Sequence, residues 1–536
     1  MEDNPGSSSS SAPAPAPPQS SVGIELEFVI MCQLQGPGPI PQMFKNSRGA
    51  PIVVEHGESR GAVVRRRVEE VIQEAVEGHK GDRIINSEAD LIGNMGTWHL
   101  RKYIDWGVGR DMTVAFHEAS LCKDPALLHY TWQDVEVTTP ALYATEKSWA
   151  EIHRVVTALQ NNFWIHSPSS AGLHVHYGRG TEYLAPAHFR RLAALLFAAD
   201  PIIAQMHPHW RRDFHTTWAP SNRLFSYLAH GTPAEEARKK IHNVTDELEP
   251  LVPPAPDPDR PEPEPRPTRK REHDFVSIFR RGTLEGYRFN TGEFDSSEPD
   301  FIDDSMKLPG TMQGVPISIR TAAQELFSAK HPSVIACLME NIYHGRMAYN
   351  LRAYGAIVYR TLDMGSDIFG PVSYQPKRTI EFRQAAGTVD PDEVIAHGKI
   401  VVRICETALR DTNDIWKMIL DCADAEKVNT WYDVFDLLIE LDLIDEARVI
   451  QRQMANERGI VIRDEARGLI KRPLREEIKR FFSRSARYIS SIFSSSNKKP
   501  ARRAGWATVR TGTTEPLLRG PVYTDGIAEA LNETIY

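Results

Sequence analysis

The stretch that decides the fold is AGLHVHYG, residues 171–178, in which two histidines stand one residue apart within an apolar run. Successive side chains of a β-strand point to opposite faces, so His174 and His176 share one face while Leu173, Val175 and Tyr177 fill the other. An isolated pair of this kind is ordinarily the polar side of a half-exposed strand. Whether the two imidazoles have a role therefore depends on what the neighbouring strands place on the same face.

Three further segments alternate in the same way: GIELEFVI (23–30), DVEVTT (134–139) and RTIEFRQ (378–384). One polar face is normal for an antiparallel sheet, but two glutamates at i and i+2 repel each other when they are held close. If the strands form one curved sheet, their common face gathers carboxylates and imidazoles around an arginine. A mainly oxygen donor set favours Mg²⁺ or Mn²⁺ over structural zinc, and such a site suits chemistry on phosphate. The polar residues of this face are Glu25, Glu27, Glu136, His174, His176, Glu381 and Arg383.

Amphipathic periodicity predicts helices at about 63–79, 145–164, 186–206, 319–346 and 391–423. The last has a clear start, because Asp390 precedes Pro391 as an N-cap and Glu393 has capping-box spacing. No GxGxxG motif opens a helix and no Walker-type loop occurs, so a Rossmann or P-loop fold is not supported. The irregular alternation of strands and helices predicts an α+β fold with a mainly antiparallel sheet flanked by helices.

Composition bounds the class of protein. The chain has 536 residues, a formal net charge of −8 and five cysteines without a CxxC pair, which fits a reducing, cytoplasmic compartment. There is neither a secretory signal nor an apolar stretch long enough to span a bilayer. We expect a disordered Ser/Ala/Pro-rich leader (1–21), a catalytic domain (22–424) with a Pro-rich insertion at about 232–310 that covers the site as a lid, and a helical extension with a basic tail (425–536).

The basic tail contains 13 Lys/Arg and 4 Asp/Glu between residues 463 and 503. A solvated face is the ordinary interpretation of such a segment. The alternatives are a nuclear-import patch at NKKPARR (497–503), which would direct the protein to the nucleus, or contact with an anionic partner such as a membrane surface or nucleic acid.

Seven motifs together resemble the amidoligase family of the glutamine synthetase-like carboxylate–amine ligase superfamily. In the family's order, these are GIELEF (23–28), WGVGRDMTV (106–114), VEVTTPAL (135–142), AGLHVHYG (171–178), HPHWRR (207–212), YNLRAY (349–354) and RTIEFRQAAGTVDPDEV (378–394). The resemblance covers about residues 22–415, apart from the Pro-rich insertion. The last motif is the most specific, because TIEFR followed by a Gly-Thr and an Asp-Pro helix start is hard to obtain by chance.

The resemblance implies a glutamine synthetase-like catalytic sheet that uses ATP and Mg²⁺ or Mn²⁺ to activate a small-molecule or peptide carboxylate as an acyl phosphate. An amine then displaces phosphate to form an amide or isopeptide bond. The choice of general base stays open among the acids of the site and the two histidines. The implied metal ligands are Glu25, Glu27, Glu136, His174 and Glu381; the implied catalytic residues are Arg383, Glu381 and His176; Arg383, Asn350, Arg352 and His174 would bind ATP, and Asp111 would help to position substrate or nucleotide.

Two alternatives stay open. One is a metal-dependent amide or ester hydrolase that activates water and needs no ATP. The other is a non-catalytic binding protein that retains the ligase fold.

The sequence also departs from the family pattern: Ala171 stands where members often carry cysteine, and Ala385 and Ala386 stand where a charged or imidazole residue is common.

Overall fold

The structure is a computed structural model, and the residues that it describes lie between Gln19 and Glu457. The described residues are 19–33, 38–87, 100–114, 124–212, 218–241, 248–255, 257–263, 316–340, 347–355, 358–359, 368–369, 378–427 and 432–457.

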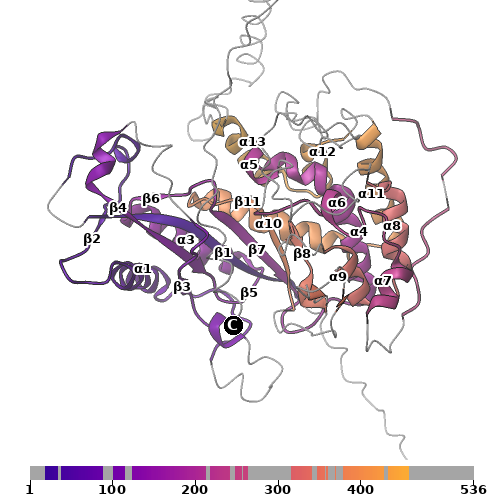
Figure 1. Cartoon of the computed structure of the whole chain (residues 1–536), viewed down its shortest axis with the longest axis horizontal. Coiled ribbons are helices and arrows are strands. Elements are labelled where there is room, and N and C mark those ends of the chain that lie inside the picture. The colour runs from indigo at the N-terminus through magenta and orange to yellow at the C-terminus, as the bar shows by residue number, and fades with distance from the viewer. Residues whose placement is uncertain are drawn as a thin grey trace, which may run out of the picture. The chain divides into compact units, whose positions relative to one another are not determined.

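A mostly antiparallel sheet with flanking helices forms the described part of the chain, which confirms the α+β class (Figure 1). The strand order along the sheet is β3 (Gly107–Gly109), β4 (Thr131–Thr138), β1 (Ser21–Gln33), β7 (Gly172–Gly178), β11 (Ile380–Ala386) and β8 (Tyr349–Asn350). Three short strands also pair with β1: β2 (Ile52–Val53), β5 (Leu142–Tyr143) and β6 (Ile165–His166). Among these pairings only that of β2 with β1 is parallel.

Alternation placed the apolar sides of the four central strands correctly. Ile24, Leu26 and Phe28 of β1 are almost completely buried, and so are Val135 and Val137 of β4. The strand β7 differs from the expectation of a half-exposed strand, since every one of its residues is buried. Its histidines therefore lie in the interior, where an imidazole needs polar partners.

Three helices cover the apolar face of the sheet: α1 (Arg60–Val76), α3 (Glu146–Asn162) and α10 (Pro391–Thr407). α10 contacts β1, β7 and α3, and its approach is close at Gly398. A Cβ atom at Gly398 would lie 2.8 Å from the ring of Trp149, so a larger residue there would have to displace the indole. Asp390 caps α10 as predicted, whereas the Glu393 carboxylate accepts from the Thr388 hydroxyl at 2.7 Å, and the Asp390 N–H also donates to that hydroxyl.

Two predicted helices are each divided in the structure. The segment 319–346 forms α8 (Ile319–Ser328) and α9 (Pro332–Leu338), because Pro332 disfavours helical geometry at His331, which caps α9. The helix predicted over 391–423 is also two helices: α10 ends at Thr407, and α11 (Thr412–Lys427) begins after Asp411. The carboxylate of Asp411 accepts from the N–H of Asp414.

A second group of helices packs around α4 (Pro186–Ile203), which contacts α8, α9, α11, α6 (Asn222–Phe225) and α12 (Val434–Glu440). α7 (Ala234–Lys240) contacts α8 and α9, α5 (His209–Arg212) contacts β11, and α13 (Ile444–Glu457) contacts α10 and α12. A further two-stranded sheet joins β9 (Val358–Tyr359) to β10 (Ile368–Phe369). Short 3-10 turns lie at Gln42–Phe44, Pro125–His129, Ala204–Met206 and Arg352–Tyr354.

The described part of the Pro-rich insertion packs on helices. The N–H of Leu251 donates to the carbonyl of Phe327 in α8, and Arg260 pairs with Asp421 and Asp424 of α11. This stretch therefore contacts α8 and α11, and the predicted lid concerns the rest of the insertion, which lies outside the described residues. The leader through residue 18 and the basic segment 463–503 also lie outside them.

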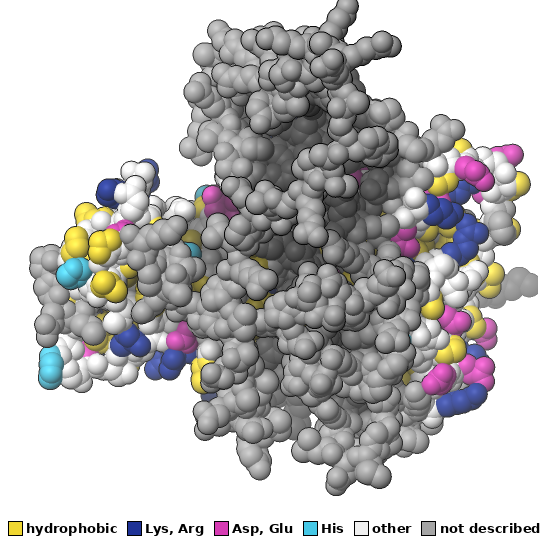
Figure 2. Space-filling model, turned by 45° about the horizontal axis from the view of Figure 1, so that its top comes forward, with side chains coloured by type: hydrophobic (Ala, Val, Ile, Leu, Met, Phe, Trp, Pro, Cys, Tyr) yellow, Lys and Arg dark blue, Asp and Glu magenta, His cyan; other side chains and the backbone are white. Residues whose placement is uncertain are grey.

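The described surface carries charges of both signs. In Figure 2, acidic and basic side chains are interspersed where described residues are visible. None of the helices in the described part of the chain combines the length and apolarity that a bilayer span requires.

Candidate active site

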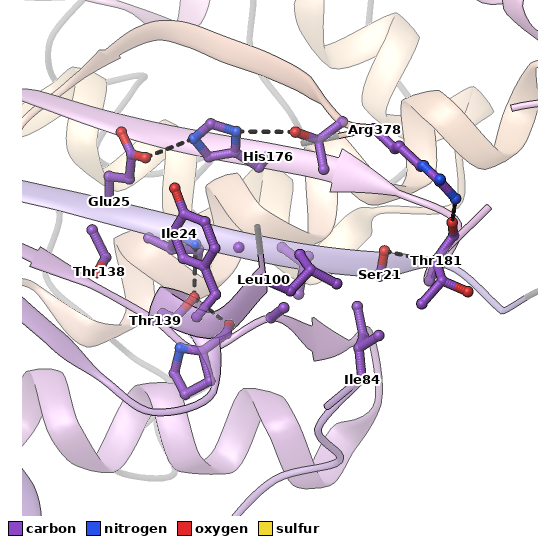
Figure 3. A pocket seen from close by; sticks show the side chains of 17 residues that line it. Ser21, Ile24, Glu25, Ile84, Leu100, Thr138, Thr139, His176, Thr181 and Arg378 are labelled. Carbon is purple, nitrogen blue, oxygen red and sulfur yellow. Dashed lines mark hydrogen bonds and ion pairs between the residues drawn. The ribbon is translucent and has the colours of Figure 1, made fainter. Parts of the chain in front are cut away.

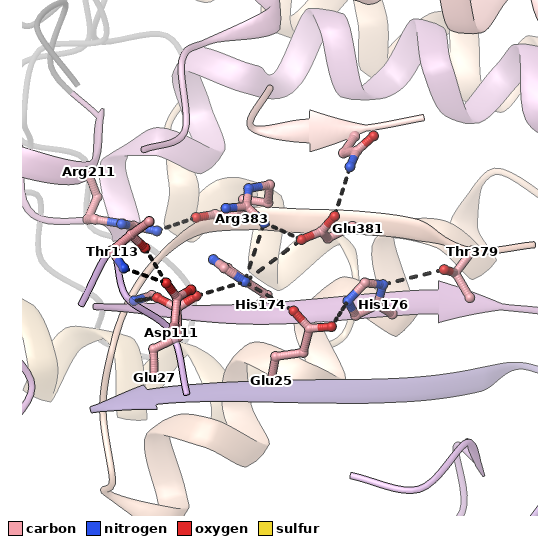
Figure 4. Close-up of polar contacts among 12 residues, drawn as sticks. Glu25, Glu27, Asp111, Thr113, His174, His176, Arg211, Thr379, Glu381 and Arg383 are labelled. Carbon is pink, nitrogen blue, oxygen red and sulfur yellow. Dashed lines mark hydrogen bonds and ion pairs between the residues drawn. The ribbon is translucent and has the colours of Figure 1, made fainter. Parts of the chain in front are cut away.

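The polar side chains found by alternation share the face of the sheet opposite α10 (Figure 4). The strand register aligns them in rows across β4, β1, β7 and β11. The directly opposed pairs are Glu25 with His174, Glu27 with Glu136, and Glu381 with His176. Segments that are distant in the sequence therefore meet at this face.

Three residues form a first group, here called the Glu25 cluster: Glu25, His176 and Glu381. One potential ligand atom from each lies within 4.8 Å of the others. The Nε2 atom of His176 is 3.0 Å from Oε1 of Glu25, and its Nδ1 is 3.4 Å from the hydroxyl of Thr379. The two carboxylates and the imidazole can therefore hold one divalent cation.

A second group, here called the Glu27 cluster, consists of Glu27, Asp111 and Glu136. Its ligand atoms also lie within 4.8 Å of one another. Asp111 enters from a turn that follows β3, and its Oδ1 accepts from the N–H and the hydroxyl of Thr113 at 2.7 and 2.6 Å. The N–H of Gly172 donates to Glu27 at 2.7 Å. This all-carboxylate group suits a hard cation such as Mg²⁺.

His174 lies between the two clusters. Its Nδ1 is 3.4 Å from a carboxylate oxygen of Glu25, 3.4 Å from one of Glu27, and 3.4 Å from Nη1 of Arg383. Burial, reinforced by Arg383, lowers the pKa of His174 to about 4. The ring is therefore neutral near pH 7 and bridges the clusters, whereas His176, which was expected to be catalytic, is the imidazole grouped with potential metal ligands.

Two buried arginines flank this face. Arg383 contacts the carboxylate of Glu381, and Nη2 of Arg211 donates to the backbone carbonyl of Arg383 at 2.6 Å. The side chain of Arg211 is 1% exposed, and burial lowers its pKa to about 10. The Nε atoms of both arginines have no hydrogen-bond partner among the described residues. Buried donors of this kind are costly unless an acceptor meets them, and a phosphate oxygen is a suitable acceptor.

The two residues of the YNLRAY motif differ in position. The side-chain amide of Asn350 donates to Glu381 at 2.8 Å and so reaches the Glu25 cluster directly. Arg352 instead pairs with Glu340 at 3.0 Å. Burial raises the pKa of Glu340 to about 7, although Arg352 opposes the shift. Arg352 therefore holds a buried carboxylate beside the site and does not contact a cluster residue.

The electrostatics of the Glu27 cluster fit a cation. Burial and the neighbouring Asp111 raise the pKa of Glu27 to about 8. A carboxyl group that is 5% exposed beside two further acids cannot ionise cheaply without positive charge. The opposite holds for Glu381: burial opposes ionisation, but Arg383 and the two histidines lower its pKa to about 2.

Two residues of this face were missed or undervalued from the sequence. Asp111 was expected only to position substrate or nucleotide, yet it completes the Glu27 cluster. Arg211 belongs to HPHWRR, a motif that carried the resemblance, but no role was assigned to it. Nothing in its local pattern separates Arg211 from Arg212, because α5 is too short to show a buried face.

Comparison with known proteins gives one match. Residues 18–224 match the family model described as "Putative amidoligase enzyme". No curated protein and no solved structure matches the chain. The match includes Glu25, Glu27, Asp111, His174 and Arg211, while the segments that carry Glu381 and Arg383 lie beyond it. Over residues 18–224, the chain is therefore similar to the amidoligase family.

Proposed function

We propose that the protein is an ATP-dependent carboxylate–amine ligase that forms an amide or isopeptide bond through an acyl phosphate on a glutamine synthetase-like sheet. The observation that carries the proposal is the placement of two potential cation sites side by side, with two buried guanidinium groups next to them. Both arginines have a free Nε donor among the described residues, and the family match supplies the reaction class.

The residues fit the metal ions that this chemistry needs. The Glu27 cluster offers three carboxylates, one of which burial keeps protonated until positive charge comes near, and the Glu25 cluster offers two carboxylates and an imidazole. When bound there, Mg²⁺ or Mn²⁺ would neutralise charge on the phosphate and carboxylate oxygens. The protein holds the ligands in place through Asn350 at Glu381, Thr379 at His176 and Gly172 at Glu27.

In the first step, a carboxylate oxygen of the substrate attacks the γ-phosphorus of ATP, and the bond from that phosphorus to the β-phosphate oxygen breaks to release ADP. Arg383 and Arg211 face the charge that spreads over the transferring phosphoryl oxygens. Both guanidinium groups are buried, so water does not compete for their donors. The attraction between these guanidinium groups and the phosphoryl oxygens of the transition state is strong because water is excluded from the site.

In the second step, the amine nitrogen attacks the acyl carbon, the carbon–oxygen bond to phosphate breaks, and inorganic phosphate leaves with the bonding electron pair. The amine must also lose a proton. Because the pKa of His174 is lowered to about 4, that ring is a weak base at neutral pH. His176 and Glu25 lie together at the edge of the site, and whichever of the two does not ligate the cation is better placed to accept the proton.

The test is to incubate the protein with MgATP, pooled amino acids and hydroxylamine, which converts an acyl phosphate into a hydroxamate. We expect ADP and hydroxamate to form with the wild-type protein, and both to be lost in Glu381→Gln and Arg383→Ala. Arg67→Gln, in an exposed ion pair on α1, is the matched control and should retain the activity. Equal ADP release in all four proteins contradicts the proposal. EDTA-sensitive cleavage of amides or esters without ADP release would support the hydrolase instead.

A further inference from the structure

A pocket of about 660 Å³, part of which is open to solvent, begins at Glu25 and His176 of the Glu25 cluster and extends toward Arg378 (Figure 3). Glu25 and His176 form its inner end. Its outer end is formed by Arg378 and the turn at Gly180 and Thr181. The walls between these ends are mainly apolar and include Val22, Ile84, Leu100, Tyr103, Pro140 and Ala141.

Arg378 is a cation without a carboxylate partner among the described residues. It donates to the backbone carbonyl of Thr181 and lies over the ring of Tyr183, 4.8 Å from its centre. These contacts fix the side chain, but no carboxylate in the described part of the chain compensates its charge. A guanidinium group has five N–H donors in a planar fork, so further donors stay free for an anion.

The two ends of the pocket are separated by a distance that one small molecule can span. Ser21, whose hydroxyl accepts from the N–H of Gly180 at the outer end, and Glu25 at the inner end both line the pocket and stand four residues apart on β1. A strand rises about 3.3 Å per residue, so these two backbone positions are about 13 Å apart. A ligand that contacts both ends therefore needs an apolar body of moderate length.

We propose that this pocket binds the carboxylate substrate of the ligation, that the reacting carboxylate faces the Glu25 cluster, and that Arg378 pairs with a second anionic group at the far end of the same molecule. The substrate class is therefore an organic dianion with an apolar spacer. This inference rests on the proposed function. An adenosine group would fill the apolar part of the pocket but has no anion for Arg378, which favours the organic substrate.

The test measures binding and does not require turnover. In the presence of Mn²⁺, isothermal titration calorimetry compares straight-chain dicarboxylates from glutarate to azelate with the monocarboxylates of equal length. We expect at least one dicarboxylate to bind about tenfold more tightly than its monocarboxylate, as for a charge-assisted hydrogen bond in a partly dry site. Arg378→Met should remove this preference and Arg378→Lys should retain part of it.

Two further variants keep the test specific. Arg154→Met is the matched control, because Arg154 also donates to a backbone carbonyl but does not line the pocket. Ala141→Leu fills the pocket and should weaken mono- and dicarboxylates alike. Equal affinity for both kinds of ligand, a preference that survives Arg378→Met, or displacement of the dicarboxylate by adenosine overturns the inference. Failure of the ligase proposal would appear separately, as dicarboxylate binding through Arg378 without ADP release under any condition.

Discussion

The Nε2 atom of His176 lies 3.0 Å from Oε1 of Glu25, across the paired strands β7 and β1. Glu27, two residues further along β1, belongs to the other cluster. The alternation of a single strand thus supplies one ligand to each of two potential cation sites. This arrangement predicts that the sites can be removed one at a time.

Manganese titration, followed by electron paramagnetic resonance, should therefore detect two sites in the wild-type protein. We expect Glu25→Gln to weaken Mn²⁺ binding at one site and Glu27→Gln to weaken it at the other. Loss of a residue that only supports a ligand typically costs about 10–100-fold in metal affinity, so loss of a ligand should cost at least as much. Glu69→Gln on the exposed face of α1 should change neither. If both variants weakened the same site equally, the assignment of two separate clusters would be wrong.

Arg211 should distinguish ATP from ADP. Its Nε donor is free among the described residues, and it lies next to Arg383 on the side of the Glu27 cluster. We expect Arg211→Gln to weaken MgATP binding by about tenfold or more while MgADP binding changes little, because only ATP presents a γ-phosphate. Calorimetric titration of both nucleotides checks this. Equal weakening of ATP and ADP, with Arg67→Gln unchanged, would show that Arg211 acts on the fold or on another part of the nucleotide.

The raised pKa of Glu27 predicts a pH dependence of stability in the absence of metal. The unfolded chain loses this proton near the ordinary value of 4.5, whereas the folded protein retains it up to about pH 8. The folded state thus binds more protons between these values, so the free energy of unfolding falls as pH rises through this window, by at most about 1.4 kcal/mol per pH unit for one group.

Urea unfolding in EDTA at pH 5, 6, 7 and 8 measures this contribution. Other groups also titrate, so the informative quantity is the difference between wild type and Glu27→Gln, which cannot ionise at that position. We expect the variant to gain stability relative to wild type as pH rises, and added Mg²⁺ to reduce that gain. A difference that does not depend on pH would contradict the assigned pKa.

Gly172 provides a steric test of the same site. A Cβ atom there would lie 2.6 Å from Nε2 of His174 and 2.8 Å from Nη2 of Arg211, so Gly172→Ala must displace one of these groups. We expect weaker binding of Mn²⁺ and MgATP with a destabilisation of about 1–3 kcal/mol, as for overpacking. Gly109→Ala is the matched control, because its nearest neighbour would be 3.9 Å away. Unchanged binding by Gly172→Ala would show that neither group matters for the ligands.

The sequence predicts the strands of this site better than its chemistry. Alternation alone identified which side of β1, β4 and β11 is apolar, because that pattern is local. It could not show that β7 is buried on both faces, since the cover over its histidines comes from segments distant in the chain. For the same reason it could not separate His174 from His176, or place Arg211 beside Arg383. The continuous helix predicted over 319–346 was wrong, although the break at Pro332 could be read from the sequence, because proline restricts the residue before it.

A buried ion pair connects the rest of the fold to the site. Arg83 donates to both carboxylate oxygens of Glu151 on α3 at 2.7 Å, and the indole N–H of Trp106 donates to the same carboxylate at 2.7 Å. Trp106 directly precedes β3, and Asp111 follows that strand. Glu151 therefore anchors the segment that delivers an acid to the Glu27 cluster.

Arg83→Met should destabilise the protein by about 3–5 kcal/mol, because it leaves a buried carboxylate without its cation. Trp106→Phe removes only one hydrogen bond and should cost about 1–3 kcal/mol. The double variant Arg83→Met with Glu151→Leu removes both charges, so it should recover much of the stability that Arg83→Met loses. Urea unfolding measures all three. If Arg83→Met and the double variant were equally unstable, the unpaired charge of Glu151 would not account for the lost stability. The contribution of Arg83 and Glu151 would then come from side-chain packing.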